Sequence, residues 1–408
     1  MHHLSLLPTL VLSYLSKASC SPLPEQRGPD LDTKGFQLPT VSHSLGGSAI
    51  CVSGLVAVNV STDVNTKLDL PINVSQLQAV DLVLGLQAAN SSLAASVSEK
   101  SSSDVVDGTF NISAQMCYPV AHPRQNQTTV QFLTHGIAFS KTYWDFALPN
   151  NSYIDTAAKA GRATFSYDRL GIGNSSHPDP IEVVQGGIQV VIAEQLVRLL
   201  RQGRLGNHAF SHVIGVGHSY GSLITTSVAA SSPSSFDAVV ATGFSTNRTG
   251  GSQFTAALNL EPASLSAPPR GRFQNLPSSY LIPSTKYGIQ YSFFRGPNFE
   301  PSVLTKAFDE VETTTLGESF TRSSFATNAA NFTGPVLIAN GARDLDFCDG
   351  DCLYPKDISA ATLEGFFPNA NNQSASYNLP EAGHGVNLAK NAPLAFDKIQ
   401  EWISSLGF

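Results

Sequence analysis

Val213-Ile214-Gly215-Val216-Gly217-His218-Ser219-Tyr220-Gly221 is an apolar run that ends in a G-x-S-x-G pentapeptide, and residues 222–230 after it have the composition of a helix. A G-x-S-x-G between a strand and a helix is typical of a nucleophile elbow, a tight turn that lifts a serine hydroxyl above the end of a sheet. The glycines are needed because side chains there would strike the neighbouring strand and helix. This stretch makes Ser219 a candidate nucleophile.

The surrounding pattern predicts strands that alternate with helices. Short apolar runs predict strands at 129–133, 163–167, 213–216, 238–241, 336–339 and 374–377, and helical spacing of apolar residues predicts helices at 182–201 and 393–406. Such alternation predicts an α/β fold with a mostly parallel central sheet and flanking helices.

The N-terminal third has a different pattern. Residues 49–60 and 108–120 carry β-branched residues in near alternation, which predicts antiparallel strands at the edge of the sheet. The Ser- and Ala-rich residues 91–103 predict a surface loop, and the Pro- and Gly-rich residues 21–44 predict a loose lead-in.

Residues 246–330 interrupt the alternation with many prolines and aromatic residues. An insertion of this length and content predicts a cap over a core made of residues 21–245 and 331–408. The aromatic side chains of the cap either line an apolar pocket or pack its own small core.

A serine hydroxyl needs a base to take its proton, and a carboxylate must hold that base in the right tautomer. His384, which lies between two glycines after the last predicted strand, is the expected base. Asp344, on the loop after the predicted strand 336–339, is the expected acid, with Asp346 as the alternative. Asp349 and Asp351 are expected to be solvated or capping residues. Asp168 and Arg169 are expected to fix the turn after the strand 163–167.

The chain carries a set of short motifs: His135-Gly136, Asp168-x-x-Gly171-x-Gly173, the elbow, Gly341-x-x-Asp344 and Gly383-His384. In these motifs the chain resembles the α/β-hydrolase superfamily. Its apolar N-terminus, its Asn-x-Ser/Thr sequons and the segment Phe347-Cys348-Asp349-Gly350-Asp351-Cys352 are similar to the secreted fungal branch. The resemblance covers about residues 113–406 and includes no His-Gly-Gly-Gly, unlike the hormone-sensitive-lipase type of esterase. It gives no role to the N-terminal ~110 residues. The resemblance implies a catalytic triad of Ser219, Asp344 and His384, and an oxyanion hole formed by the backbone N–H groups of Tyr220 and Ile137.

Residues 1–20 resemble a secretory signal peptide, with an apolar stretch from Leu4 to Leu15 and small residues before Cys20. A disordered or membrane-tethering N-terminus is the alternative. No other stretch is long and apolar enough to span a bilayer. Sequons for N-glycosylation support secretion and begin at Asn59, Asn73, Asn90, Asn111, Asn126, Asn150, Asn174, Asn247, Asn331 and Asn372.

Cleavage near Cys20 leaves four cysteines, Cys51, Cys117, Cys348 and Cys352, which allow three disulfide pairings. The favoured pairs are Cys51 with Cys117 and Cys348 with Cys352. Free buried thiols are one alternative, and a metal site that includes Cys348 and Cys352 is another.

These features predict a secreted serine hydrolase that acts on a small-molecule carboxylic ester, lactone or thioester without a metal or organic cofactor. A serine rather than an aspartate at the elbow argues against epoxide hydrolase or dehalogenase chemistry. The alternatives are a natural-product pathway enzyme that uses the same site for cyclisation, acyl transfer or product release, and a non-catalytic binding protein of the same fold. The net charge of −7 gives no reason to expect nucleic-acid binding.

Overall fold

The structure is a computed structural model, and it describes residues 31–88, 90–122, 127–247, 249–266 and 271–408. Residues 33–408 form one compact unit, which contains all the elements named below. The predicted signal sequence and the sequon at Asn126 lie outside the described residues.

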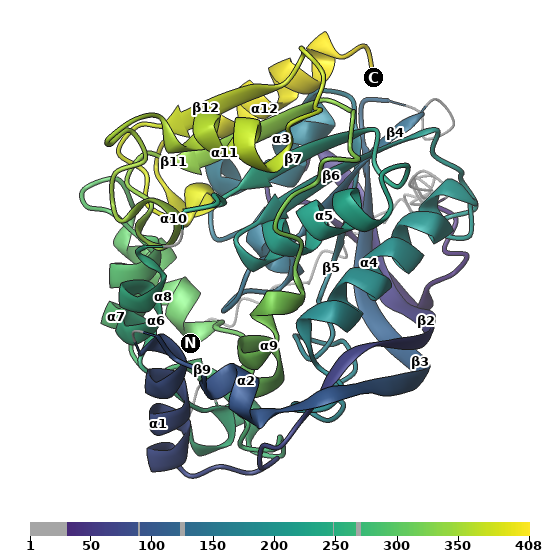
Figure 1. The fold of residues 1–408 in the computed structure, drawn as a ribbon. Coiled ribbons are helices and arrows are strands. Elements are labelled where there is room, and N and C mark those ends of the chain that lie inside the picture. The colour runs from purple at the N-terminus through teal and green to yellow at the C-terminus, as the bar shows by residue number, and fades with distance from the viewer. Residues whose placement is uncertain (1–30, 89, 123–126, 248, 267–270) are drawn as a thin grey trace, which may run out of the picture. The chain divides into compact units, whose positions relative to one another are not determined.

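The central sheet has nine strands in the order β1-β2-β3-β5-β4-β6-β7-β11-β12 (Figure 1). β1, β2 and β3 pair antiparallel, β3 also pairs antiparallel with β5, and every later pair is parallel. The strands are β1 (Gln37–His43), β2 (Ala49–Leu68), β3 (Ser98–Pro119), β4 (Thr129–Thr134), β5 (Ala163–Tyr167), β6 (His212–His218), β7 (Ala238–Thr242), β11 (Val336–Gly341) and β12 (Ala375–Leu379).

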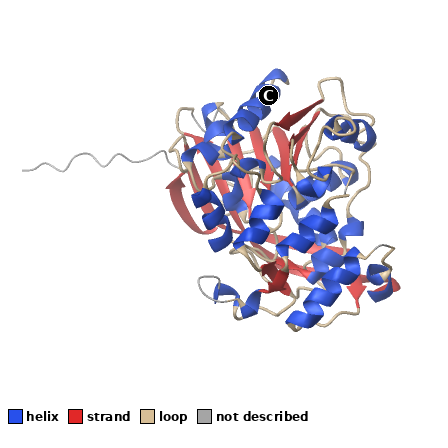
Figure 2. Cartoon of the chain, turned by 90° about the vertical axis from the view of Figure 1, so that its left-hand side faces the viewer, coloured by secondary structure: helices blue, strands red, loops and turns tan. Residues whose placement is uncertain are grey.

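The parallel strands form the core of the sheet. Every residue of β4, β5, β7 and β11 is buried, as expected where helices cover both faces of a parallel sheet. The strands run between two pairs of packed helices: α4 (Gly186–Arg201) with α5 (Tyr220–Ser231), and α3 (Tyr153–Lys159) with α12 (Ala392–Ser405). Figure 2 shows helices packed over the central strands. The predicted α/β fold with a mostly parallel central sheet and flanking helices is therefore confirmed.

The apolar pattern of the sequence predicted helix α4 but placed its start too early. Ile188, Ile192, Leu196 and Leu200 lie one helical turn apart and are all buried. The predicted start at Glu182 is wrong by four residues. Asp179 Oδ1 accepts hydrogen bonds from the N–H groups of Ile181 and Glu182, which holds residues 179–185 in a turn before the helix.

Two predictions for the N-terminal third are wrong. Part of the predicted lead-in is strand β1, which pairs with β2 although all its side chains are exposed, so no apolar pattern marks it. The predicted loop at 91–103 contains helix α2 (Leu93–Val97) and the start of β3. The pairing of β2 with β3 extends from Ala49 opposite Pro119 to Leu68 opposite Ser98. The start of β3 is therefore a strand because its backbone pairs with the end of β2, which the local composition does not reveal.

The segment 246–330 lies between β7 and β11 and belongs to the same compact unit as the sheet. Its three short strands form a separate antiparallel sheet in the order β10-β9-β8. Its helices and strands are α6 (Gly251–Leu258), β8 (Leu260–Pro262), β9 (Tyr280–Pro283), α7 (Lys286–Phe293), α8 (Pro301–Asp309), β10 (Thr314–Thr315) and α9 (Leu316–Phe320).

The remaining helices are α1 (Gln76–Gln87), between β2 and β3, and α10 (Leu345–Cys348) and α11 (Ile358–Phe366), between β11 and β12. Among the described residues, no helix has the length and apolar character needed to cross a bilayer.

Candidate active site

Ser219 lies at the turn between β6 and α5 and is 3% exposed. Its backbone has φ 56° and ψ −121°, a conformation that non-glycine residues rarely adopt. The turn leaves no room for side chains beside it: a Cβ on Gly221 would lie 2.0 Å from the carbonyl oxygen of Thr134. The N–H of Ser219 donates to the carbonyl of Thr242 at 2.9 Å, which fixes the turn against β7.

His384 and Asp344 continue from Ser219 in a line of hydrogen bonds. His384 Nε2 lies 2.8 Å from Ser219 Oγ, and His384 Nδ1 lies 2.8 Å from Asp344 Oδ2. Because an ionised carboxylate only accepts, Nδ1 carries the proton and Nε2 is left as the acceptor for the serine hydroxyl. Asp344 follows strand β11 and His384 follows strand β12, and both residues are fully buried.

The electrostatics of His384 suit a base that must become positively charged. Burial alone would lower its pKa, but the charge of Asp344, the hydrogen bond to Asp344 and the charge of Asp346 outweigh burial, so the pKa of His384 is raised above its ordinary value. Arg295 acts in the opposite direction. The imidazolium is thus the better-stabilised form in this site.

The two candidate acids have different positions. Asp344 bonds to His384 with one carboxylate oxygen, and its other oxygen accepts the N–H of Phe347 at 3.1 Å, which caps α10. Asp346 lies within α10 and lines a cavity beside the site. The structure therefore brings Asp344, and not Asp346, to the imidazole ring.

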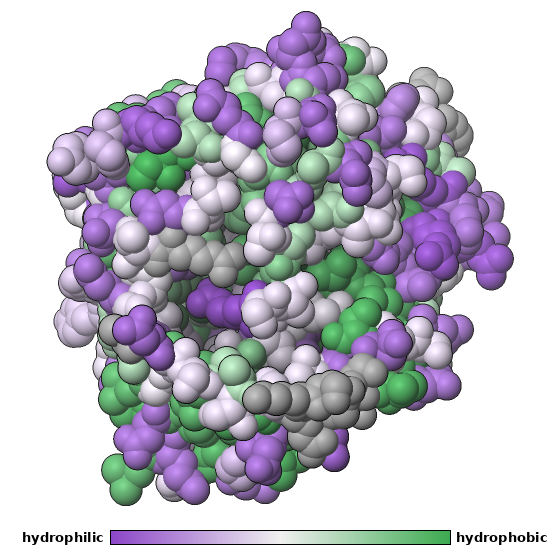
Figure 3. Space-filling model, in the orientation of Figure 1, coloured by the Kyte–Doolittle hydropathy of each residue, from purple (hydrophilic) through white to green (hydrophobic). Residues whose placement is uncertain are grey.

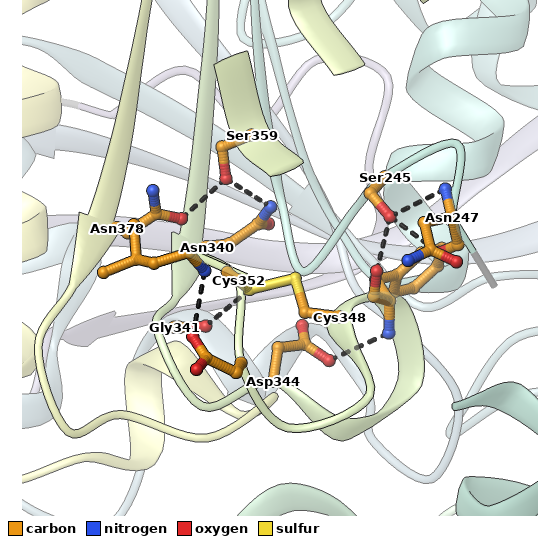
Figure 4. Close-up of a disulfide and its surroundings, with 12 residues drawn as sticks. Ser245, Asn247, Asn340, Gly341, Asp344, Cys348, Cys352, Ser359 and Asn378 are labelled. Carbon is orange, nitrogen blue, oxygen red and sulfur yellow. Dashed lines mark hydrogen bonds between the residues drawn. A yellow bond between two sulfur atoms is a disulfide. The ribbon is translucent and has the colours of Figure 1, made fainter. Parts of the chain in front are cut away.

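A disulfide and several hydrogen bonds hold the loop that carries Asp344 (Figure 4). Cys348 and Cys352 are joined, and the Sγ of Cys352 lies 3.1 Å from the carbonyl oxygen of Gly341. The N–H of Gly350 donates to the carbonyl of Asp344 at 2.7 Å. The other favoured pair, Cys51 and Cys117, is also joined, and it links β2 to β3.

The N–H groups expected to form the oxyanion hole belong to Tyr220 and Ile137, and both residues line the cavity beside Ser219. Tyr220 is the first residue of α5, so its N–H has no acceptor inside the helix. Gly136 packs against the elbow: a Cβ on it would lie 2.9 Å from that of Ser219. Tyr220 follows Ser219 directly in the chain, and Ile137 follows Gly136, which packs against Ser219.

A buried polar network fixes the peptide group between Gly136 and Ile137 through its carbonyl oxygen. The carbonyl oxygen of Gly136 accepts from His135 Nδ1 at 2.8 Å and from Arg169 Nη2 at 3.5 Å. His135 Nε2 accepts the N–H of Arg169 at 3.1 Å, so both ring nitrogens are used by the neutral form. Burial and the charge of Arg169 lower the pKa of His135 well below its usual value, which keeps the ring neutral.

The guanidinium of Arg169 links the elbow to segment 246–330. It lies over the ring of Tyr220, 4.5 Å from the centroid, and forms a fully buried ion pair with Glu318 of α9. Glu318 Oε1 also accepts from Gln189 of α4 at 3.1 Å. The prediction that Asp168 and Arg169 fix a turn is confirmed for Asp168, which accepts the N–H groups of Lys141 and Asn174, but Arg169 also reaches the site.

Sequence reasoning missed Glu318, although a local signal marks it. Thr315-Leu316-Gly317-Glu318 has the spacing of a capping box, and both bonds of that box are present at the start of α9. The pattern reveals the helix start, whereas the partner Arg169 lies 149 positions away and cannot be read from it.

A cavity of about 340 Å³ opens beside the elbow. The surface in Figure 3 is hollowed where α6 and α9 face each other in Figure 1. The lining residues of the cavity come from four parts of the chain: the α1–α2 region, Ile137 with Tyr220, segment 246–330 and α10. They include Val83, Leu86, Gln87, Ala94, Ile137, Tyr220, Thr255, Leu258, Leu260, Glu318, Phe320, Arg322, Asp346 and Phe347.

Within the described part of the chain, no group of three or more His, Cys, Asp or Glu side chains could hold a metal ion.

The sequon asparagines within the described residues differ in exposure. Asn247 is half-buried. The exposed ones are Asn59, Asn73, Asn90, Asn111, Asn150, Asn174, Asn331 and Asn372.

The profile described as "Alpha/beta hydrolase family" matches residues 132–396, which include the elbow, Asp344 and His384. A search of curated proteins finds no match. Solved structures with a similar fold include a thermophilic esterase from Thermogutta terrifontis with malate bound, at 12% identity over 73% of this chain and 94% of that chain, with a TM-score of 0.48.

Two other similar structures are an alpha/beta hydrolase fold protein from Chitinophaga pinensis and Est1E from Butyrivibrio proteoclasticus with ferulic acid bound. The first is 14% identical over 72% of this chain and 94% of that chain, with a TM-score of 0.48. The second is 15% identical over 72% of this chain and 95% of that chain, with a TM-score of 0.45.

Proposed function

Because the chain belongs to the α/β hydrolase family, we propose that it is a secreted serine hydrolase that cleaves a carboxylic ester, lactone or thioester. The observation that carries this proposal is the continuous hydrogen-bonded line from Ser219 through His384 to Asp344. A nucleophile, a base and an orienting carboxylate in this arrangement are what acyl transfer through a serine requires.

In the proposed reaction, Ser219 Oγ attacks the carbonyl carbon while its proton passes to His384 Nε2. The tetrahedral intermediate collapses, the bond to the alcohol or thiol breaks, and the leaving group takes the proton from Nε2. Water then repeats the sequence on the acyl-enzyme, and the acid is released. Asp344 keeps the ring in the right tautomer and stabilises the imidazolium in both halves.

The N–H groups of Tyr220 and Ile137 are proposed to hold the oxygen of the tetrahedral intermediate. Each such donor contributes about 3 kcal/mol to stabilising the transition state. The bonds from His135 and Arg169 to the Gly136 carbonyl support this role, because they fix the peptide plane and polarise its N–H.

We also propose that segment 246–330 acts as the cap and that residues 1–20 are a signal peptide, as in the secreted fungal branch. Support for secretion comes from the exposed sequons and from two disulfides, which persist in oxidising compartments. Glycan mapping of protein secreted from a fungal host tests this part of the proposal. Asn247 is expected to be modified least, because it is half-buried.

The direct test is turnover of p-nitrophenyl esters and a lactone panel by the wild type and by Ser219→Ala. The variant is expected to lose at least about 10⁴-fold in kcat while far-UV circular dichroism stays the same. Ser222→Ala is a matched control, because Ser222 is also buried at the start of α5 but its hydroxyl bonds only to the backbone carbonyl of Thr242. Unchanged turnover in Ser219→Ala would reject the proposal.

A further inference from the structure

The insertion at residues 69–97 between β2 and β3 contains α1 and α2, and α1 contacts β8 of the small sheet (Figure 1). Its helix α1 starts at a capping box formed by Ser75 and Gln78. The sequence of α1, Gln-Leu-Gln-Ala-Val-Asp-Leu-Val-Leu-Gly-Leu-Gln, is rich in large apolar residues.

Burial in the core does not explain the apolar composition of α1. Ala79 is its one buried residue, and Leu77 and Leu84 are 79% and 57% exposed. The side of α1 that carries Val83, Leu86 and Gln87 lines the cavity beside Ser219. The composition of α1 therefore suits a helix that covers a cavity and not one that fills a core.

Specific bonds hold the insertion against segment 246–330. Gln76 Nε2 donates to the carbonyl of Leu260 at 3.4 Å, and Ser278 Oγ accepts the N–H of Val74 at 2.6 Å. Ser279 Oγ donates to the carbonyl of Pro71 at 2.9 Å. These bonds fix the insertion against β8 and the residues just before β9.

The lining of the cavity indicates which part of an ester would occupy it. The cavity is lined by Ile137 and Tyr220, the residues that carry the proposed oxyanion donors, and by neither Ser219 nor His384. The leaving group must contact His384 Nε2 to receive its proton, whereas the acyl group stays on Ser219 with its oxygen toward the N–H donors. A cavity on the side of the N–H donors therefore suits the acyl group, which would extend between the lining residues of α1 and α6.

We propose that α1 forms the outer wall of an acyl-binding pocket and that Val83 and Leu86 set the acyl length the enzyme accepts. This inference rests on the proposed hydrolase function. The volume of about 340 Å³ is near the lower end of the range for ligand pockets, about 300–1,000 Å³, which fits an ester with a medium-length apolar acyl group.

The test measures kcat/KM for p-nitrophenyl esters from acetate to dodecanoate. The wild type is compared with the variants Val83→Trp, Leu86→Trp and Leu86→Ala. For the wild type, kcat/KM is expected to rise about fourfold per added methylene until the cavity is filled. The two tryptophan variants should reduce the octanoate-to-acetate ratio at least about tenfold, and Leu86→Ala should move the optimum to longer chains. Leu77→Trp, on the exposed side of the same helix, is the matched control and should keep the wild-type profile.

A binding measurement separates this inference from the proposed function. Methyl ketones of the same chain lengths cannot be hydrolysed, and their affinity for Ser219→Ala is measured by calorimetry with and without Val83→Trp. If esters are turned over but all α1 variants keep the wild-type chain-length profile, the proposal that α1 forms the wall of the acyl pocket is wrong, whereas the proposed hydrolase function is supported. If no ester is turned over but ketone affinity rises with length and Val83→Trp weakens it, the pocket wall stands and the hydrolase proposal falls.

Discussion

At the scale of single residues, the backbone of Ser219 is held in place by its surroundings. Its positive φ is rare for a non-glycine residue and costs on the order of 1–3 kcal/mol. The bond from its N–H to Thr242 and the close packing of Gly136 and Gly221 maintain this geometry. A strained serine at the end of a strand exposes its hydroxyl to the base, so the strain is part of the proposed function.

This strain predicts that two variants of Ser219 differ in stability. Ser219→Gly should be more stable than Ser219→Ala by about 1 kcal/mol or more in urea unfolding, because glycine adopts a positive φ without the Cβ clash. Equal stability of the two variants would show that the turn is not strained.

The pKa of His384 predicts the acid side of the pH profile. The base must be neutral to accept the serine proton, so kcat/KM should fall as the pH decreases through a pKa above the ordinary value of 6.5. Asp346→Asn removes a charge that raises this pKa and should move the acid limb to lower pH. Arg295→Gln removes a charge that lowers it and should move the limb to higher pH. Shifts in the same direction in both variants would contradict the electrostatic account.

At the scale of elements, a buried ion pair ties helix α9 of segment 246–330 to the site. The buried pair of Arg169 and Glu318 connects α9 to the end of β5 and supports the elbow through Tyr220. Glu318→Gln would leave the buried guanidinium without its counter-charge.

We therefore expect Glu318→Gln to lower the free energy of unfolding by about 3–5 kcal/mol. Glu310→Gln is the matched control, because Glu310 pairs with Lys306 at an exposed position and the change should cost less than about 1 kcal/mol. A loss for Glu318→Gln no larger than that of the control would show that the buried pair is not structural.

The two disulfides are expected to differ in what they stabilise. Replacing Cys51 and Cys117 by serine removes a link between residues 66 positions apart, which is worth about 4 kcal/mol in the chain-entropy model. Replacing Cys348 and Cys352 opens a span of 4 positions, worth about 2 kcal/mol, but frees the loop that carries Asp344. The second replacement should therefore lower kcat at least about tenfold and the first should not. A larger loss of kcat on replacing Cys51 and Cys117 than on replacing Cys348 and Cys352 would contradict the claim that the second disulfide positions Asp344.

At the scale of the whole molecule, the sheet brings distant residues together because parallel strands end at the same edge. Ser219, Asp344 and His384 follow β6, β11 and β12, and each lies on a loop whose local sequence identifies it. The convergence of these three side chains could be predicted for that reason: each lies in a short motif, and the order of the strands brings the motifs together.

Other parts of the molecule depend on contacts that no local pattern encodes. The strand β1 has seven exposed residues and exists through its pairing with β2. The ion pair of Arg169 with Glu318 joins segments 149 positions apart, and the cavity lining brings Leu86 together with Ile137 and with residues of segment 246–330. These features depend on three-dimensional packing, so the sequence predicted the line of Ser219, His384 and Asp344 better than the cavity beside it.

The central claim is that His384 activates Ser219 for covalent attack. Its most direct test is the intact mass of the protein after reaction with a fluorophosphonate, followed by peptide mapping. We expect one adduct, on Ser219, that is absent in Ser219→Ala and forms at least about 10³-fold more slowly in His384→Ala. No adduct, or an adduct on another residue in a protein that still hydrolyses esters, would contradict the claim.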